Sequence, residues 1–583
     1  MYKTSSPYVK ELLKGEIQWR PFTKSTLDAS IRENKVTFIH IGNISKTPER
    51  EAAYKLFRTR KVIDIMNKHF IPIALDTEDV PEAVLIGLDM LLINEKQISI
   101  PINAFSLPGI RPITAFSSME AGDFLAISKN VIDSFAHKRP LLRKVSDGMM
   151  ESLAGTGVIT HKESPREINA KVLHTYVKSW ESRIMESNTL QSPYLINTRF
   201  LIFFLKYYSR YQMYDKLLLL QERIDQLYYS SMFDPIDGGL FTRAIDSSYK
   251  EPLFEKSFSE NIQASAMFSF AYKYYGSLHY KVAAERIQDF IESEFKSPHG
   301  GYMTAITLQT GIDKCTYFRY SLKELKKHFP IRYTQIALYL GMDISIDETI
   351  YQNISNTEQY WHITPDELNE LKKIRKAKKE IVLDKRVITA YNCMYASSLC
   401  ICARNIKEIR NDSIQRAEEI IRTTLIEQKQ GKITLHRYIL SGSDTYIQSD
   451  LFDYAFFLNA ILLLLRSTQK EEYKTLSRKY TAYILLNFYQ SCNGMFSKAA
   501  KDTQITPLKR ESIMDYIRFS ANSIMARNLF ILSKITGDQF YMDAFKQQIY
   551  NIESQLIGSG PLMVGWALQI LNLLTDKHGY EEI

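Results

Sequence analysis

The chain has 583 residues, of which 45% are hydrophobic and 24% are charged, and its net charge is +9 at pH 7. It exceeds the roughly 250–300 residues at which a single core stops growing, so more than one domain is expected. The charge is dilute and no Lys/Arg block alternates with aromatic residues, which argues against nucleic acid as a partner. No apolar run approaches the roughly 20 residues of a membrane span, so membrane insertion is not expected.

The five cysteines include no CxxC pair, and their odd number argues against a complete framework of disulfides. The amino terminus has no apolar segment of the kind that a secretory signal contains. These features predict a protein of a reducing compartment, the cytoplasm.

Alternating helices and strands are predicted over the first 130 residues. A helix at 25–34 precedes a buried strand at 36–42, a helix at about 49–68 precedes a second buried strand at 70–76, and a helix at 81–92 precedes a third strand that follows Pro101. This order predicts a small α/β domain with a parallel or mixed sheet.

Several short motifs in this region resemble the amino-terminal thioredoxin-like domain of the YyaL and spermatogenesis-associated protein 20 family. They are Ser6-Pro7-Tyr8, Trp19, Arg32 to Lys35, Ile41-Gly42, Asn67 to Phe70, Leu75-Asp76 and Ile100 to Asn103. The family usually continues after the first strand with a Cys-His-Trp-Cys-type motif. Here the matching stretch runs from Ser45 to Arg50 and contains Lys46 and Glu49 instead.

Dithiol exchange needs one thiolate to attack and a second thiol to resolve the mixed disulfide. The first 150 residues contain no cysteine, so this domain is predicted to be inactive in redox chemistry. Lys46 and Glu49 mark the degenerate redox position. Pro101 is a candidate for the cis-proline beside thioredoxin-like sites, an assignment that the resemblance implies, although a proline can also simply open a strand.

Helical periodicity dominates after residue 130, and residues 131–165 are predicted to be a linker. The pattern predicts helices at 166–183, 196–212, 214–232, 259–275, 279–295, 386–404, 413–428, 450–467, 470–490, 516–536, 538–555 and 561–575.

A weak internal repeat groups these helices in pairs. Glycine-containing turns start at Gly238, Gly300, Gly431, Gly494 and Gly558, with spacings of 62, 131, 63 and 64 residues. The long spacing predicts an insertion at about 304–384. Paired helices at a fixed period must stack to bury their apolar faces, so residues 166–583 are predicted to close into an (α/α)6 toroid, with an open superhelix as the alternative.

The resemblance extends into this region, where the family is similar to the six-hairpin toroids of glycosidases and sugar epimerases. Matched family motifs, together with the polar stretch 232–261, nominate ligand-binding residues in the toroid cavity: Phe254, Glu255, Lys256, Glu260, Asn261, Asp384, Asn392, Asp453, Tyr454, Asp515 and Asn522. Two departures are evident. A family stretch rich in carboxylates falls on 304–310, which has none, and the family's histidine before Phe254 is Leu253.

Glycoside cleavage needs two carboxyl groups across the sugar, and the loss of acids at 304–310 makes it less expected here. The leading hypothesis is therefore a non-redox, non-catalytic binding or interaction protein. Its cavity would hold a polar, carbohydrate-like ligand, and its thioredoxin-like domain could bind a protein partner. The alternatives are a sugar epimerase or glycoside hydrolase that uses the cavity carboxylates, and a structural subunit of a larger assembly.

Metal and cofactor sites are not predicted. The histidines, cysteines and acids have no metal-ligand spacing, and neither a P-loop nor a GxGxxG nor a GxSxG motif is present.

Overall fold

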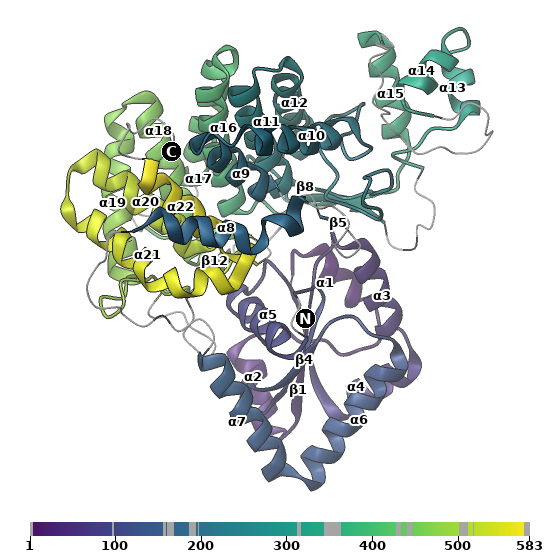
Figure 1. Cartoon of the computed structure of the whole chain (residues 1–583). Helices are drawn as coiled ribbons and strands as arrows, with labels where there is room; N and C mark the ends of the chain where they lie inside the picture. The colour runs from purple at the N-terminus through teal and green to yellow at the C-terminus, as the bar shows by residue number, and fades with distance from the viewer. Residues whose placement is uncertain are drawn as a thin grey trace. The chain divides into compact units, whose positions relative to one another are not determined.

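The structure is a computed structural model of the chain (Figure 1). It describes residues 4–95, 98–155, 159, 168–185, 194–195, 198–309, 311, 316–342, 363–426, 433–439, 446–500, 511–516 and 518–575. The chain divides into two compact units. Unit 1 comprises residues 1–165, 433–455 and 478–552, and unit 2 comprises residues 166–432, 456–477 and 553–583.

Unit 1 contains a four-stranded sheet in the order β2 (Phe70–Asp76), β1 (Val36–Gly42), β3 (Ile102–Leu107) and β4 (Arg111–Phe116). Strands β1 and β2 are parallel, with Val36 paired to Phe70, and β3 and β4 are antiparallel to their neighbours. Strand β4 was not predicted. It follows β3 through a short turn at Gly109 (φ +80°), so the two strands form a hairpin.

Alternate residues of β1 enter different cores because side chains along a strand point to opposite faces. Phe38 packs with Phe57, Phe105 and Phe124 in one core, and Ile41 packs with Leu88 in the other. The helices that supply these cores are α1 (Pro7–Leu12), α2 (Lys24–Arg32), α3 (Thr47–Phe57), α4 (Arg60–His69), α5 (Pro81–Glu95), α6 (Ala121–His137) and α7 (Arg139–Gly155).

Two features of this domain differ from the sequence prediction. The helix predicted at 49–68 is two helices, α3 and α4, which break at Arg58 and Thr59. The segment predicted as a linker, 131–165, contains the end of α6 and all of α7. Helix α7 buries Leu142, Met149 and Leu153 and packs on β4 and α5, so it is an integral part of the domain.

The helical region contains the twelve predicted helices. They are α8 (Ala170–Met185), α9 (Thr198–Arg210), α10 (Tyr214–Tyr229), α11 (Phe258–Tyr275), α12 (Leu278–Phe290), α16 (Thr389–Asn405), α17 (Arg410–Ile426), α18 (Leu451–Thr468), α19 (Glu471–Asn487), α20 (Ala521–Thr536), α21 (Gln539–Ser559) and α22 (Val564–Thr575).

Helix pairs define this region. In unit 2, α9 packs on α10, α11 on α12, and α16 on α17, while α11 also contacts α9 and α16. The last helix, α22, contacts α8 and α9, the first two helices of the series, as a closed ring requires. The predicted fold class is confirmed: a thioredoxin-like α/β domain followed by an all-α (α/α)6 region.

The predicted insertion at 304–384 lies in unit 2. It contains β9 (Ala305–Leu308), α13 (Leu322–His328), α14 (Tyr333–Tyr339), α15 (Pro365–Ala377) and β10 (Ile381–Asp384). The helices enclose a small core of their own, which includes Leu325, Ile336 and Leu371. Several short strands between the helices were not predicted. They are β5 (Tyr194–Leu195), β6 (Arg243–Ala244), β7 (Pro252–Leu253), β8 (Lys256–Ser257), β11 (His436–Ile439) and β12 (Tyr446–Gln448).

Candidate functional site

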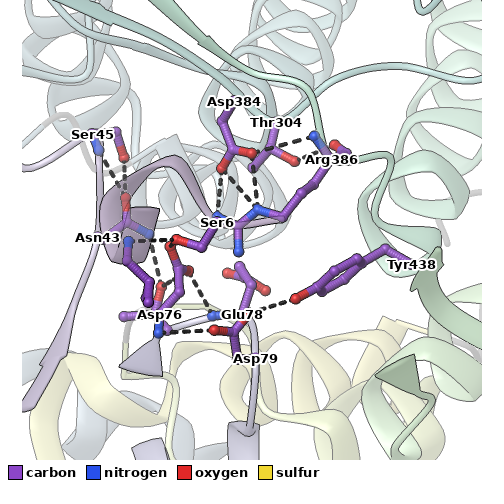
Figure 2. A network of polar contacts seen from close by, with 12 residues as sticks. Ser6, Asn43, Ser45, Asp76, Glu78, Asp79, Thr304, Asp384, Arg386 and Tyr438 are labelled. Atoms are coloured by element: carbon purple, nitrogen blue, oxygen red, sulfur yellow. Dashed lines mark hydrogen bonds and ion pairs between the residues drawn. The ribbon is translucent and has the colours of Figure 1, made fainter. Parts of the chain in front are cut away.

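A polar network occupies the carboxyl end of β2 in unit 1 (Figure 2). Ser6 Oγ donates to Asp76 Oδ2 at 2.6 Å, and Asn43 Nδ2 donates to Thr77 Oγ1 at 2.7 Å. Asn43 Oδ1 accepts hydrogen bonds from both the backbone N–H and the hydroxyl of Ser45. Since ligands of α/β sheets bind beyond the carboxyl ends of parallel strands, this edge is the natural place for a site in the thioredoxin-like domain.

The degenerate redox position lies beside this network. Lys46 directly precedes α3, and Glu49 lies in the first turn of that helix. The Ile100–Pro101 peptide bond is cis, as the resemblance implies. Hydroxyl and amide groups, from Ser45 and Asn43, therefore stand near the start of α3, at the predicted degenerate redox position.

Arg437 links the end of β2 to Asp453 within unit 1. Its Nε donates to the carbonyl oxygen of Glu78 at 2.8 Å, and its guanidinium also pairs with the Glu78 carboxylate. Nη1 lies 3.2 Å from Asp453 Oδ2. Arg437 and Asp453 are completely buried, so the pair is shielded from water. The Tyr438 hydroxyl donates to Asp79 on the same loop, as Figure 2 shows.

A small pocket of about 40 Å³ lies next to Arg437's partners in unit 1. Asp450, Lys498, Arg518 and Ser512 supply its polar groups, and Phe452, Tyr516 and Phe519 supply aromatic rings. The Arg518 guanidinium lies over the Phe452 ring at 4.8 Å from the centroid and pairs with Glu78 at 3.1 Å. The pocket thus offers both signs of charge beside flat apolar surfaces.

Two ionisable groups at this place have pKa values displaced toward neutrality. Burial raises the pKa of Asp453 to about 6, although Arg437 opposes the shift. Burial lowers the pKa of Lys498 to about 8, although Asp450 at 3.9 Å opposes it. Of the two, Lys498 lines the pocket, and a displaced pKa at such a place is a common mark of functional sites.

The three predicted asparagines make the same contact in three repeats. Asn261 accepts from the Leu240 N–H and donates to the Leu240 carbonyl, Asn392 does the same with Tyr302, and Asn522 does the same with Phe496. Each backbone partner follows a glycine turn of the internal repeat. The repeat therefore encodes a clamp between a turn and the start of the next inner helix. Gly431 of the repeat lies outside the described residues.

Tyr454 and Asp515 are also bound to backbone in unit 1. The Tyr454 hydroxyl accepts from the Leu435 N–H at 3.1 Å, and its ring stacks on Tyr483. Asp515 Oδ1 accepts from the Ser520 N–H at 2.7 Å, next to the start of α20. The Asp515 contact orients the loop that carries Tyr516, Arg518 and Phe519 of the pocket, and the Tyr454 contact orients the segment that carries Arg437.

The 232–261 stretch holds two buried ion pairs in unit 2. Glu255 Oε1 accepts from Arg243 Nε at 2.7 Å. Lys256 Nζ donates to Asp234 Oδ2 at 2.6 Å and to the Gly238 carbonyl, and it lies over the Phe290 ring at 4.3 Å.

Arg375 of α15 completes this cluster, because its Nη1 lies 2.6 Å from both Asp234 and Asp237. Burial alone would raise the pKa of Asp234, but Arg375 and Lys256 hold it well below its ordinary value. The insertion is thereby attached to the polar stretch through a fully buried salt bridge.

The other predicted residues of unit 2 that are described here, Asp384, Phe254 and Glu260, make separate contacts. Asp384 binds Arg386 through two hydrogen bonds, Nε to Oδ1 at 2.8 Å and Nη2 to Oδ2 at 2.5 Å (Figure 2). The Phe254 ring stacks on Phe318 at 5.4 Å. Glu260 is half-buried in the first turn of α11.

The prediction named the acids but missed most of their partners. Arg243 stood in the polar stretch, and Arg386 stands two residues after Asp384, so local charge pairing could have revealed both. Glu78, Arg437, Lys498 and Arg518 give no local signal, since they are brought together only by the fold.

Residues 1–154 match the family Thioredox_DsbH, described as a protein of unknown function, DUF255. Mouse spermatogenesis-associated protein 20 is 18% identical over 605 residues, which cover 92% of this chain and 76% of the mouse protein. This chain is thus similar to spermatogenesis-associated protein 20 over most of its length.

Solved structures similar to this chain include an α-mannanase and a cellobiose 2-epimerase. An α-mannanase of Bacteroides thetaiotaomicron is 12% identical with a TM-score of 0.44, covering 69% of this chain and 97% of the mannanase. A cellobiose 2-epimerase of Bacillus thermoamylovorans is 8% identical with a TM-score of 0.42, covering 66% of this chain and 88% of the epimerase.

Among the described residues, no group of three or more His, Cys, Asp or Glu side chains is placed to hold a metal ion, and Cys393, Cys400, Cys402 and Cys492 form no disulfide bond. Two segments, Leu451–Thr468 and Gln539–Thr575, are long and apolar enough to cross a membrane. They are 83% and 56% buried within the molecule, as core helices of globular proteins are.

Proposed function

We propose that this chain is a non-redox, non-catalytic binding protein, and that its polar pocket in unit 1 holds part of a carbohydrate-like ligand. The observation that carries the proposal is the pairing of the predicted carboxylates with arginines. Glu255 pairs with Arg243, Asp384 with Arg386, and Asp453 with Arg437. All three carboxylates are buried.

This pairing opposes the chemistry of a glycosidase. Such an enzyme needs one carboxylic acid and one carboxylate that both reach the glycosidic bond. A carboxylate whose oxygens are engaged by a guanidinium is a poor base and a poor acid, because each role would require the ion pair to be broken. The cysteine-free first domain supports the non-redox part of the proposal.

The lining of the pocket supports a polar ligand. Ser512, Lys498 and Arg518 can donate hydrogen bonds and Asp450 can accept them, while Phe452 and Tyr516 offer flat apolar faces to a sugar ring. Its volume of about 40 Å³ suits an end group of the ligand rather than a complete sugar.

The test is a thermal-shift screen with neutral sugars, sugar acids and amino sugars, followed by calorimetry on each hit. We expect binding without turnover, and a loss of affinity of about tenfold or more in Arg518→Gln, which removes a charge-assisted donor. Arg60→Gln is the matched control, because Arg60 is exposed and does not line the pocket. Failure of every sugar class to bind would contradict the proposal.

A carbohydrate-active enzyme is the second candidate, and the pKa values of Asp453 and Lys498 favour it. An acid with a pKa of about 6 and an amine with a pKa of about 8 are both suited to proton transfer near neutral pH. Turnover or epimerisation of any sugar hit that is abolished by Asp453→Asn, with binding retained, would establish this reading in place of the first.

We further propose that a protein partner binds the thioredoxin-like domain, at the sheet edge formed by the carboxyl ends of β1 and β2. Within unit 1, Arg437 and Tyr438 already bind Glu78 and Asp79 at that edge. A partner would therefore have to dock beside these residues, near Ser45 and Lys46.

The absence of a disulfide bond at the four described cysteines agrees with a cytoplasmic location, which we also propose.

A further inference from the structure

A basic pocket of about 180 Å³ lies in unit 2, where α16 ends, α17 begins and α18 ends. Four of the residues that line it are cationic: Arg404, Lys407, Arg410 and Arg466. The remaining lining residues are apolar or neutral, and they include Cys400 and Ser467. This pocket shares no residue with the site described above.

The lining carries no negative charge. Burial raises the pKa of the Cys400 thiol to about 12, so it stays protonated. Three carboxylates on the neighbouring turn and on α17 are paired with cations that do not line the pocket. Glu408 pairs with Lys281 at 2.7 Å, Asp412 with Arg416 at 2.5 Å, and Glu418 with Lys470 at 2.5 Å.

The helix dipoles favour only two of these four cations. Arg404 and Arg466 lie in the last turns of α16 and α18, where a cation is favourable. Lys407 precedes α17 and Arg410 is its first residue, at the positive end of a 17-residue helix, where a cation is unfavourable. The dipole of α17 therefore does not favour Lys407 and Arg410 at this place, and an anion between the four side chains would offset their mutual repulsion.

We propose that this pocket binds a small dianion, namely the phosphate group of inorganic phosphate or of a small phosphoester. Guanidinium groups match the oxygens of phosphate through paired hydrogen bonds, and the amino terminus of α17 adds backbone N–H donors of the same polarity. A volume of 180 Å³ is below the roughly 300 Å³ at which pockets begin to enclose drug-sized ligands, so the site suits one anionic group.

The test is calorimetry of the full-length chain with inorganic phosphate, with a hexose 6-phosphate, and with the same hexose without phosphate. Lys407→Gln/Arg410→Gln removes two exposed charges, so this double variant should fold normally. We expect phosphate to bind the natural chain and the affinity to fall about tenfold or more in the double variant.

Arg478→Gln/Lys479→Gln is the matched control, because it also removes one exposed arginine and one exposed lysine and touches neither pocket. Equal binding of phosphate and hexose 6-phosphate would identify free phosphate as the ligand, and tighter binding of the hexose 6-phosphate would identify a phosphoester. Absence of binding at about 10 mM of both anions, or equal affinity in the double variant and the control, would overturn the proposal. The hexose without phosphate measures any binding of the sugar itself in unit 1, so binding at the basic pocket is judged from inorganic phosphate and from the double variant.

Discussion

Arg437 and Glu78 lie 359 positions apart in the sequence and are joined by a hydrogen bond from Nε to the carbonyl oxygen at 2.8 Å and by a guanidinium–carboxylate pair. Asp453 shares the same guanidinium. Unit 1 is therefore held together by a buried charge network as well as by apolar packing.

Replacing Arg437 should destabilise unit 1 strongly. Arg437→Met leaves the buried carboxylates of Glu78 and Asp453 without this cation, and breaking such a network costs about 3–5 kcal/mol of unfolding free energy. Urea denaturation followed by circular dichroism measures the loss. Arg60→Met is the control, since Arg60 makes an exposed pair with Glu16 and should change the stability by less than about 1 kcal/mol. A loss for Arg437→Met no larger than the control's would show that the network is not structural.

Replacing Asn522 distinguishes a structural role, in which its amide holds the Phe496 backbone, from the predicted role in ligand binding. Asn522→Ala leaves the buried N–H and C=O of Phe496 without that side chain, which should cost about 1–3 kcal/mol of unfolding free energy. Asn411→Ala, at an exposed position, is the comparison. Unchanged stability combined with weaker sugar binding would instead assign Asn522 to the ligand.

Arg375→Met should loosen the attachment of the insertion in unit 2. The variant leaves Asp234 and Asp237 without their shared guanidinium, again at a cost of about 3–5 kcal/mol. We expect faster cleavage by trypsin between residues 316 and 384, measured by mass spectrometry of timed samples. Lys373→Met, on the exposed side of the same helix, should leave the cleavage rate near that of the natural chain.

The stability of unit 1 should fall in mild acid because of His40. His40 is fully buried between the Tyr8 hydroxyl at 2.6 Å and Asn103 at 2.7 Å, and burial lowers its pKa to about 4 from 6.5. The unfolded chain then binds the proton more tightly than the folded chain, so stability is fully present above pH 6.5 and is lost as the pH falls toward 4. The total loss should be about 3 kcal/mol.

Denaturation at several pH values checks this dependence. His40→Gln can keep a hydrogen bond but cannot be protonated, so the acid-dependent loss should shrink in that variant. His137→Gln, at an exposed histidine, should retain it. An identical pH profile for natural chain and His40→Gln would contradict the assignment.

Local patterns determined the elements of this protein. The hydrophobic run 36–42 is fully buried as β1, and apolar spacing at helical period located the twelve helices of the (α/α)6 region to within a few residues. The absence of cysteine from the first 150 residues is likewise a property of the sequence alone. At α7 the prediction was a linker, because the sequence does not show that β4 and α5 cover the apolar face of this helix.

The partners of the charged residues were decided by tertiary structure. Sequence patterns could nominate Glu255 and Asp453 but could not show that Arg243 and Arg437 neutralise them, since an ion pair depends on distances that the fold alone sets. Likewise, the glycine repeat was visible in the sequence, whereas its pairing with Asn261, Asn392 and Asn522 emerged only when each turn met the next inner helix. Burial then displaced the pKa values of His40, Asp453 and Lys498, because the cost of charging a group depends on how much water the folded chain removes from it.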